Sequence, residues 1–192
     1  LAMTITASPA SEITQGFSFE NGTLLDVKCK QKLADGISTM LSAIGDGIDA
    51  KGTASTPQRV ANMYDELLSG YRTDQVELLN GAMYDVEYDE MVVVKDIDFY
   101  SLCEHHLLPF YGKVHVGYLP RKKVIGLSKI PRLVDMFSRR LQVQERMTQQ
   151  IATVMDEMIE PIGVGVIVEA QHLCTAMRGV EKHNTIMTTS SL

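Results

Sequence analysis

The feature that most constrains the fold is a strict alternation of side chains near the C-terminal end of the chain. Across residues 164–174, every second residue is in turn Val, Val, Val, Ala, His and Cys, whereas Ile, Glu, Gln and Leu stand at positions between them. Successive side chains of a β-strand point to opposite faces, so the pattern predicts a strand with one face against a core. Strands are also predicted at 91–94 and at 114–118, where apolar and β-branched residues gather.

Helices are predicted between these strands. Ser128 is a candidate N-cap with Pro131 in the first turn, and helical spacing continues from there towards Glu160. One apolar stripe follows this segment: Val143, Met147, Ile151, Val154, Met155, Met158 and Ile159. The order strand–strand–helix–helix–strand indicates an α+β unit over residues 91–192, which we expect to be the catalytic domain.

The first half of the chain shows helical spacing instead of strand alternation. Residues 1–22 are rich in Ser, Thr and Gly and are expected to form a flexible segment. Apolar residues recur at helical spacing between 24 and 48, with Gly45 and Gly47 weakening and ending the helix. A second helix is expected to open at Thr56-Pro57, because proline fits the first helical turn. Residues 23–90 are therefore predicted to be a helical N-terminal part.

The composition excludes several classes of function. A formal net charge of −6 is a poor match for nucleic-acid or membrane-surface binding, which needs a basic footprint. The sequence has no run of about 20 apolar residues to span a bilayer. The first residues lack the basic and apolar regions of a secretory signal, and the three cysteines are too few and odd in number for a disulfide framework. These features predict a cytoplasmic protein.

A candidate metal site is formed by Cys103, His106 and Cys174. Thiolate and imidazole are the ligands that zinc prefers, and a Cys-x-x-His pair can hold one ion from a tight turn. A structural zinc site needs four ligands, whereas three leave an open position for an activated water. Plain burial of the cysteines is the alternative, because free Cys is among the most buried residue types.

Two histidines accompany these ligands. His105 is the neighbour of His106, and on an extended strand His172 would share a face with Cys174. Histidines beside a metal-activated water suit general acid/base catalysis near neutral pH. His115 and His183 have no such neighbours and are interpreted as surface or packing residues.

A basic cluster and a carboxylate complete the candidates. Lys129 and Arg132 are three residues apart at a predicted helix start, where free N–H groups already favour anions, and Arg178 follows the second metal motif. A solvated charged surface is the alternative for all three. Glu145 could accept two parallel N–H donors such as those of a guanine, or could be a solvated helix charge.

Several blocks of sequence together resemble GTP cyclohydrolase I, and their order and spacing agree with that family across roughly residues 24–190. The blocks are Asp98-Phe99-Tyr100-Ser101-Leu102-Cys103-Glu104-His105-His106-Leu107-Leu108-Pro109-Phe110, Gly126-Leu127-Ser128-Lys129, Gln142-Val143-Gln144-Glu145-Arg146, His172-Leu173-Cys174 with Met177-Arg178-Gly179-Val180, and Thr56-Pro57-Gln58-Arg59-Val60.

The resemblance implies a tunnelling fold, an antiparallel sheet backed by two helices, in a ring-shaped homo-oligomer. The family's ring is a decamer with active sites at subunit interfaces. The resemblance also implies roles by motif position: Cys103, His106 and Cys174 as Zn²⁺ ligands; His105 and His172 as acid/base residues; Gln144 and Glu145 as the purine pocket; and Ser128, Lys129, Arg132, Arg178 and Arg59 as the triphosphate site.

The implied activity is hydrolytic opening of the GTP imidazole ring, with release of formate and formation of 7,8-dihydroneopterin triphosphate. Two alternatives remain at this point. Another tunnelling-fold pterin or deazapurine enzyme would share the fold and the purine-binding carboxylate, but would use three-His zinc or a cysteine nucleophile. A non-catalytic, zinc-stabilised interaction domain would need a fourth ligand and no purine pocket.

Overall fold

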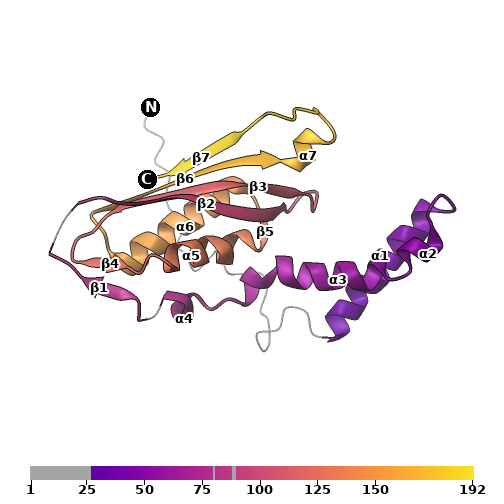
Figure 1. Cartoon of the computed structure of the whole chain (residues 1–192), viewed down its shortest axis with the longest axis horizontal. Coiled ribbons are helices and arrows are strands. Elements are labelled where there is room, and N and C mark those ends of the chain that lie inside the picture. Colours follow the sequence, from indigo (N-terminus) through magenta and orange to yellow (C-terminus); the bar gives the residue numbers. More distant parts are fainter. Residues whose placement is uncertain (1–26, 80, 88–89) are drawn as a thin grey trace, which may run out of the picture.

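The structure is a computed structural model that describes residues 27–192 except 80, 88 and 89. The segment 1–22 predicted to be flexible, and the first residues of the helix expected from 24, lie outside the described residues. A helical hairpin opens the described chain and stands to one side of the sheet (Figure 1). Its elements are α1 (Val27–Ile44), α2 (Ala50–Thr53) and α3 (Thr56–Leu67).

Both predicted ends in this hairpin are found. Helix α1 ends at Ile44, and Gly45 follows with a φ of 86°, a left-handed conformation that glycine adopts without steric cost. Pro57 lies in the first turn of α3. The short helices η3 (Ser69–Arg72) and α4 (Gln75–Leu79) then lead into the sheet domain.

A five-stranded sheet forms the centre of the molecule, in the order β5-β2-β3-β6-β7. All neighbours are antiparallel except β2 and β5, which run parallel. The strands are β2 (Val92–Cys103), β3 (Pro109–Leu119), β5 (Leu141–Gln142), β6 (Gly163–His172) and β7 (Met187–Ser191). Two further strands, β1 (Met83–Asp85) and β4 (Lys123–Ile125), pair with each other outside this sheet.

Helices α5 (Lys129–Ser138) and α6 (Gln144–Ile159) pack on one face of the sheet (Figure 1). The core lies between them and the alternate residues of the strands, which are fully buried: Phe99, Phe110, Val114, Val116, Tyr118, Val166 and Val168. The α+β class and the two-helix layer predicted from the sequence are confirmed. Within the described residues, no helix is long and apolar enough to cross a membrane.

Four details differ from the sequence-based expectation. The helical stretch towards Glu160 is interrupted, because Leu141 and Gln142 pair with Leu102 and Cys103 as strand β5. Strand β2 is much longer than 91–94. Its register shifts between Val94 and Ile97, and this bulge hid the alternation that identifies a strand.

The other two differences concern the C-terminal end. The last predicted strand stops at His172, and Cys174 lies in the following short helix α7 (Leu173–Ala176). The polar tail beyond Lys182, where no element is predicted, contains strand β7, which pairs with β6. Its residues are Met, Thr and Ser, so the pattern lacks the apolar alternation by which a strand is recognised.

Candidate functional site

The turn between β2 and β3 brings two predicted metal ligands together. Cys103 is the last residue of β2, and its carbonyl accepts hydrogen bonds from the N–H groups of His106 (3.3 Å) and Leu107 (2.8 Å). Leu107 has a φ of 55°, which closes the turn. The turn folds His106 back over Cys103, so that its Nδ1 lies 3.7 Å from the Cys103 Sγ.

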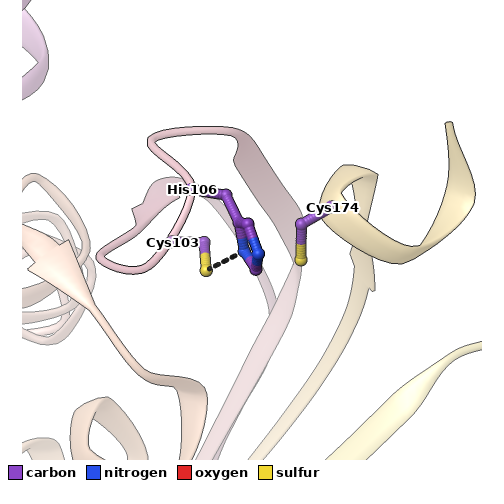
Figure 2. A group of neighbouring side chains, drawn as sticks. All are labelled: Cys103, His106 and Cys174. Atoms are coloured by element: carbon purple, nitrogen blue, oxygen red, sulfur yellow. Dashed lines mark hydrogen bonds between the residues drawn. The ribbon is translucent and has the colours of Figure 1, made fainter. Parts of the chain in front are cut away.

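The third ligand arrives from the other end of the sequence. Strand β6 pairs with β3 so that His172 lies opposite Phe110. Phe110 follows closely on the turn of residues 103–107, which we call the metal turn, and α7 begins immediately after His172. Figure 2 shows Cys174 facing the Cys103–His106 pair. The ligand atoms of these three residues all lie within 4.8 Å of one another.

The two cysteines of this site would be stabilised as thiolates by a cation between them. Cys103 and Cys174 are 8% and 9% exposed. Burial raises the pKa of the Cys174 thiol, and the neighbouring Cys103 raises it further. Two thiolates this close would repel each other in a desolvated site, whereas a divalent cation between them would stabilise both. The donor set therefore fits a metal ion that accepts sulfur and nitrogen.

A bidentate ion pair anchors the same turn to α6. The two carboxylate oxygens of Glu104 accept hydrogen bonds from Arg146 Nη1 (2.7 Å) and Nη2 (2.8 Å). The hydrogen bonds from Arg146 lower the pKa of the Glu104 carboxyl. His105, the next residue, is exposed, and its Nδ1 lies 3.8 Å from the Cys103 Sγ. The ion pair thus holds in place the backbone that carries His105 and His106.

His172 is the half-buried histidine of the site. Its ring stacks on Phe110, with centroids 4.7 Å apart and planes within 3°. Its Nε2 lies 2.7 Å from the Oε1 of Gln144. Burial lowers the pKa of His172, while the charge of Glu145 acts in the opposite direction.

Gln144 and Glu145 begin α6 beside this histidine. Glu145 is exposed in the first turn of the helix, free to meet a ligand. Gln144 is 1% exposed and its side-chain amide is hydrogen-bonded within the protein. The expectation that Gln144 contacts a purine stays a prediction, and the structure gives its side chain a different set of partners.

The predicted basic residues do not gather in one place within the chain. Lys129 and Arg132, at the start of α5, line a pocket of about 320 Å³ with α4 residues, and Lys129 Nζ donates to the Leu78 carbonyl (2.6 Å). Arg178 instead lies close enough to Cys174 for its charge to lower that thiol's pKa, although burial dominates. Ser128 precedes α5 but makes no side-chain capping bond, so the predicted N-cap interaction is absent.

Comparison with known proteins agrees with the motif-based resemblance. The family model described as GTP cyclohydrolase I matches residues 33–192. The chain belongs to the GTP cyclohydrolase I family. It is 56% identical over 156 residues to GTP cyclohydrolase 1 of Leptospira biflexa serovar Patoc, covering 81% of this chain and 85% of the relative. It is 53% identical over 163 residues to GTP cyclohydrolase 1 of Campylobacter jejuni subsp. jejuni serotype O:23/36, covering 85% and 86%.

The enzyme class predicted from the sequence, GTP cyclohydrolase I, is confirmed by these relatives. GTP cyclohydrolase 1 of Methylococcus capsulatus is similar as well, at 54% identity over 155 residues, 81% of this chain and 84% of the relative. The candidate site residues of this family member fall into two groups. One group lies around the turn between β2 and β3. It contains the three candidate metal ligands and, beside them, His105, His172, Glu145 and Arg178. Lys129 and Arg132 line a pocket with residues of α4, and Figure 1 shows α4 and β4 away from the turn between β2 and β3.

Two residues of this GTP cyclohydrolase I site received no role from the sequence. Arg146 stands one residue after Glu145, and its partner Glu104 is inside the Cys-Glu-His-His motif. An acidic residue in a turn that also holds metal ligands was a signal for a structural ion pair. The partner could not be found from the sequence, because 42 residues separate the two.

Proposed function

We propose that this GTP cyclohydrolase is a zinc enzyme that hydrolyses the imidazole ring of GTP, releases formate and forms 7,8-dihydroneopterin triphosphate. The observation that carries the proposal is the cluster of Cys103, His106 and Cys174 beside the half-buried His172. Among the residues that the structure describes, this cluster offers three ligands and no fourth. Three protein ligands are the pattern of a catalytic zinc site, so the alternative of a closed structural site is disfavoured.

The spacing of Cys103 and His106 suits zinc. Ligand atoms 2.0–2.3 Å from a tetrahedral Zn²⁺ lie roughly 3.4–3.8 Å from one another, and the Cys103 Sγ to His106 Nδ1 distance is 3.7 Å. Cys103, His106 and Cys174 would hold the ion. When bound there, Zn²⁺ makes a water molecule a nucleophile near neutral pH by lowering its pKa.

The remaining residues of the site would bind the substrate and move protons. His172 would protonate the purine imidazole ring, and the exposed His105 would assist later proton transfers. The stack on Phe110 and the bond to Gln144 keep the His172 ring in one orientation. Such fixed geometry lowers the barrier because the proton donor need not be reoriented during the reaction.

Incubation of the zinc-loaded protein with GTP tests this function. We expect formate in the solution and, after oxidation, the fluorescence of a pterin triphosphate. GTP that is consumed without formate would indicate another reaction on the same substrate. Unchanged GTP under conditions in which zinc is bound would contradict the proposal.

Glu145 is proposed to accept two guanine N–H groups. Replacement of Glu145 by alanine should weaken GTP binding by roughly 2–5 kcal/mol, because the guanine donors would stay unpaired in a desolvated pocket. Calorimetric titration with GTP measures the loss. Glu157 is an exposed carboxylate farther along α6, and Glu157→Ala is the matched control with unchanged affinity. Wild-type affinity in Glu145→Ala would identify Glu145 as a solvated helix charge.

Lys129, Arg132 and Ser128 are proposed to bind the triphosphate, with Arg178 and Arg59 as further contributors. Within one chain, Lys129 and Arg132 lie apart from the metal turn, so the proposal requires a site shared between subunits. We expect GTP to bind much more tightly than guanosine, by a margin that shrinks as salt is added, since the difference comes from charge pairing.

Calorimetry with both ligands over a range of salt measures this difference. Arg132→Ala should reduce the preference for GTP, whereas Lys122→Ala, which removes an exposed lysine of the turn before β4, should not. Equal affinity for GTP and guanosine in the wild type would rule out the triphosphate role.

We also propose that the chain has the tunnelling fold and assembles into a ring-shaped homo-oligomer. The family resemblance implies that this ring is a decamer. The support for these proposals is that, among the described residues, both edges of the sheet are open. Strand β5 covers only Leu102 and Cys103 of β2, and β7 pairs on one side, with β6. Open strand edges favour pairing with another chain. Light scattering should therefore give the mass of a large oligomer, and a monomeric mass in an active sample would contradict the ring.

A further inference from the structure

The orientation of the Gln144 amide is fixed by what its nitrogen faces. The two N–H groups of Nε2 face three acceptors, the carbonyl of Val168 (3.0 Å), the carbonyl of Met187 (2.9 Å) and the Oγ1 of Thr189 (3.1 Å), so one hydrogen is shared. Main-chain carbonyls can only accept hydrogen bonds. The reversed amide would place Oε1 against two carbonyl oxygens inside a site where Gln144 is 1% exposed, and unpaired buried polar groups are costly.

A chain of hydroxyl groups supports the same orientation. Thr148 Oγ1 donates to the main-chain carbonyl of Gln144 (2.8 Å), and the two hydroxyl oxygens of Thr148 and Thr189 lie 2.7 Å apart. Because the hydroxyl proton of Thr148 is donated to the Gln144 carbonyl, the hydrogen bond between the two threonines must use the hydroxyl proton of Thr189. Thr189 Oγ1 then has a lone pair directed at the amide nitrogen of Gln144, which completes a consistent network.

The network determines which nitrogen of His172 carries hydrogen. The Oε1 of Gln144 can only accept, and it lies 2.7 Å from the Nε2 of His172, so Nε2 must be the donor. Stacking on Phe110 holds the ring in this orientation. Among the described residues, no hydrogen-bonding group faces the His172 Nδ1.

We propose that Gln144 is a positioning residue that holds neutral His172 as the Nε2–H tautomer and makes Nδ1 the atom that exchanges protons with the substrate. The proposal rests on the proposed function of His172 as an acid/base residue. As a base, neutral His172 takes a proton at Nδ1 and becomes the imidazolium. As an acid, the imidazolium gives the Nδ1 proton to a ring nitrogen of the purine and returns to the neutral Nε2–H form, and in both directions the Nε2–H bond to Gln144 stays intact. The role differs from the purine contact expected for this side chain.

Strand β7 takes part in this arrangement. Met187 and Thr189 supply two of the three acceptors for Gln144 Nε2, and both belong to the C-terminal strand. The last residues of the chain therefore fix the histidine tautomer at a distance, through Gln144. For a histidine that binds a metal, loss of the partner that fixes its tautomer and ring orientation costs about 10–100-fold in activity, and we expect a loss of the same order for His172.

Solid-state nitrogen NMR of the zinc-loaded full chain, labelled with ¹⁵N-histidine, tests the proposal without any change to the site. At about pH 8, above the ordinary histidine pKa of about 6.5, we expect a protonated Nε2 and an unprotonated Nδ1 for His172. The signals of His172 are those missing from His172→Gln. A protonated Nδ1 with an unprotonated Nε2 in the wild type would overturn the proposal.

Variants then connect the tautomer with the rate. Gln144→Leu should lose the preference for Nε2–H and lower kcat by about 10–100-fold, with zinc content unchanged and the KM for GTP kept within about threefold. Gln150→Leu removes another buried glutamine of α6, one bonded to Gln142, and should leave both tautomer and kcat unchanged.

Two outcomes would overturn the positioning role. Gln144→Leu could keep both the Nε2–H tautomer and the wild-type kcat, or Gln150→Leu could lose as much kcat as Gln144→Leu, which would reduce the effect to loss of packing. Failure of the proposed function is distinguishable, because the wild type would then form no pterin product while the NMR measurement still reports the tautomer.

Discussion

Cys103→Ser, His106→Ala and Cys174→Ser should each remove zinc from the protein and reduce GTP ring opening to the background of the assay. The three ligand atoms lie within 4.8 Å of one another, and a site with three protein ligands has no redundancy, so two remaining ligands would not retain the ion. Serine is close to cysteine in size, which keeps the buried packing nearly unchanged. Zinc per chain, measured by elemental analysis of the purified variants, is the first readout.

Binding of GTP should survive in these variants better than the reaction does. The metal acts at the reacting carbon, whereas Glu145 and the basic residues are proposed to hold the parts of GTP that do not react. Cys29→Ser is the matched control, because Cys29 lies in α1 and outside the metal cluster, and it should keep both zinc and activity. A full zinc content in any one of the three ligand variants would remove that residue from the ligand set.

His172→Ala should keep its zinc and lose kcat by about 10²–10⁴-fold, the usual contribution of a general acid or base. His172 is placed beside the cluster by strand β6, with its Nε2 bonded to Gln144, and is not one of the three grouped ligands. Steady-state kinetics and zinc analysis of the same preparation measure the two quantities together. A melting curve is needed, because the variant leaves the buried Oε1 of Gln144 unpaired.

His183→Ala is the control for this second prediction, since His183 is exposed beyond α7; it should be active. Loss of zinc from His172→Ala as complete as that from Cys103→Ser would mean that the site has four protein ligands. The open catalytic position would then not exist. Near-normal kcat together with normal zinc content in His172→Ala would instead assign the acid/base role to another group. The next candidate would be His105, which lies beside Cys103.

Much of the fold could be read from local patterns. Strand β6 was predicted because its Val and Ala residues alternate against one buried layer, and helix α6 because its apolar stripe recurs at helical spacing. Strand β7 was missed, since Thr and Ser residues carry no such alternation and are held there by pairing with β6. The extension of β2 was missed because the bulge at Asp96, whose N–H donates to His115 Nδ1, breaks the period.

The predicted strand end illustrates the limit of an alternation pattern. The period of two continues through His172 to Cys174, yet the backbone turns into α7 after His172. Cys174 nevertheless reaches the metal cluster, because the end of β6 lies beside the turn at the end of β2 and start of β3. Cys174 thus joins the predicted group of candidate ligands, whereas the strand geometry predicted for it was wrong.

The sequence by itself determined the elements and the chemistry that depend on near neighbours. The Cys-x-x-His spacing closes in a single turn, and amphipathic periods select helix or strand within a few residues. The tertiary structure alone decided which distant groups meet: Glu104 with Arg146, His172 with Gln144, and Gln144 with Thr189. The physical reason is that a hydrogen bond forms between groups within about 3 Å, and only the pairing of strands and the packing of α6 on the sheet bring residues far apart in sequence to that distance.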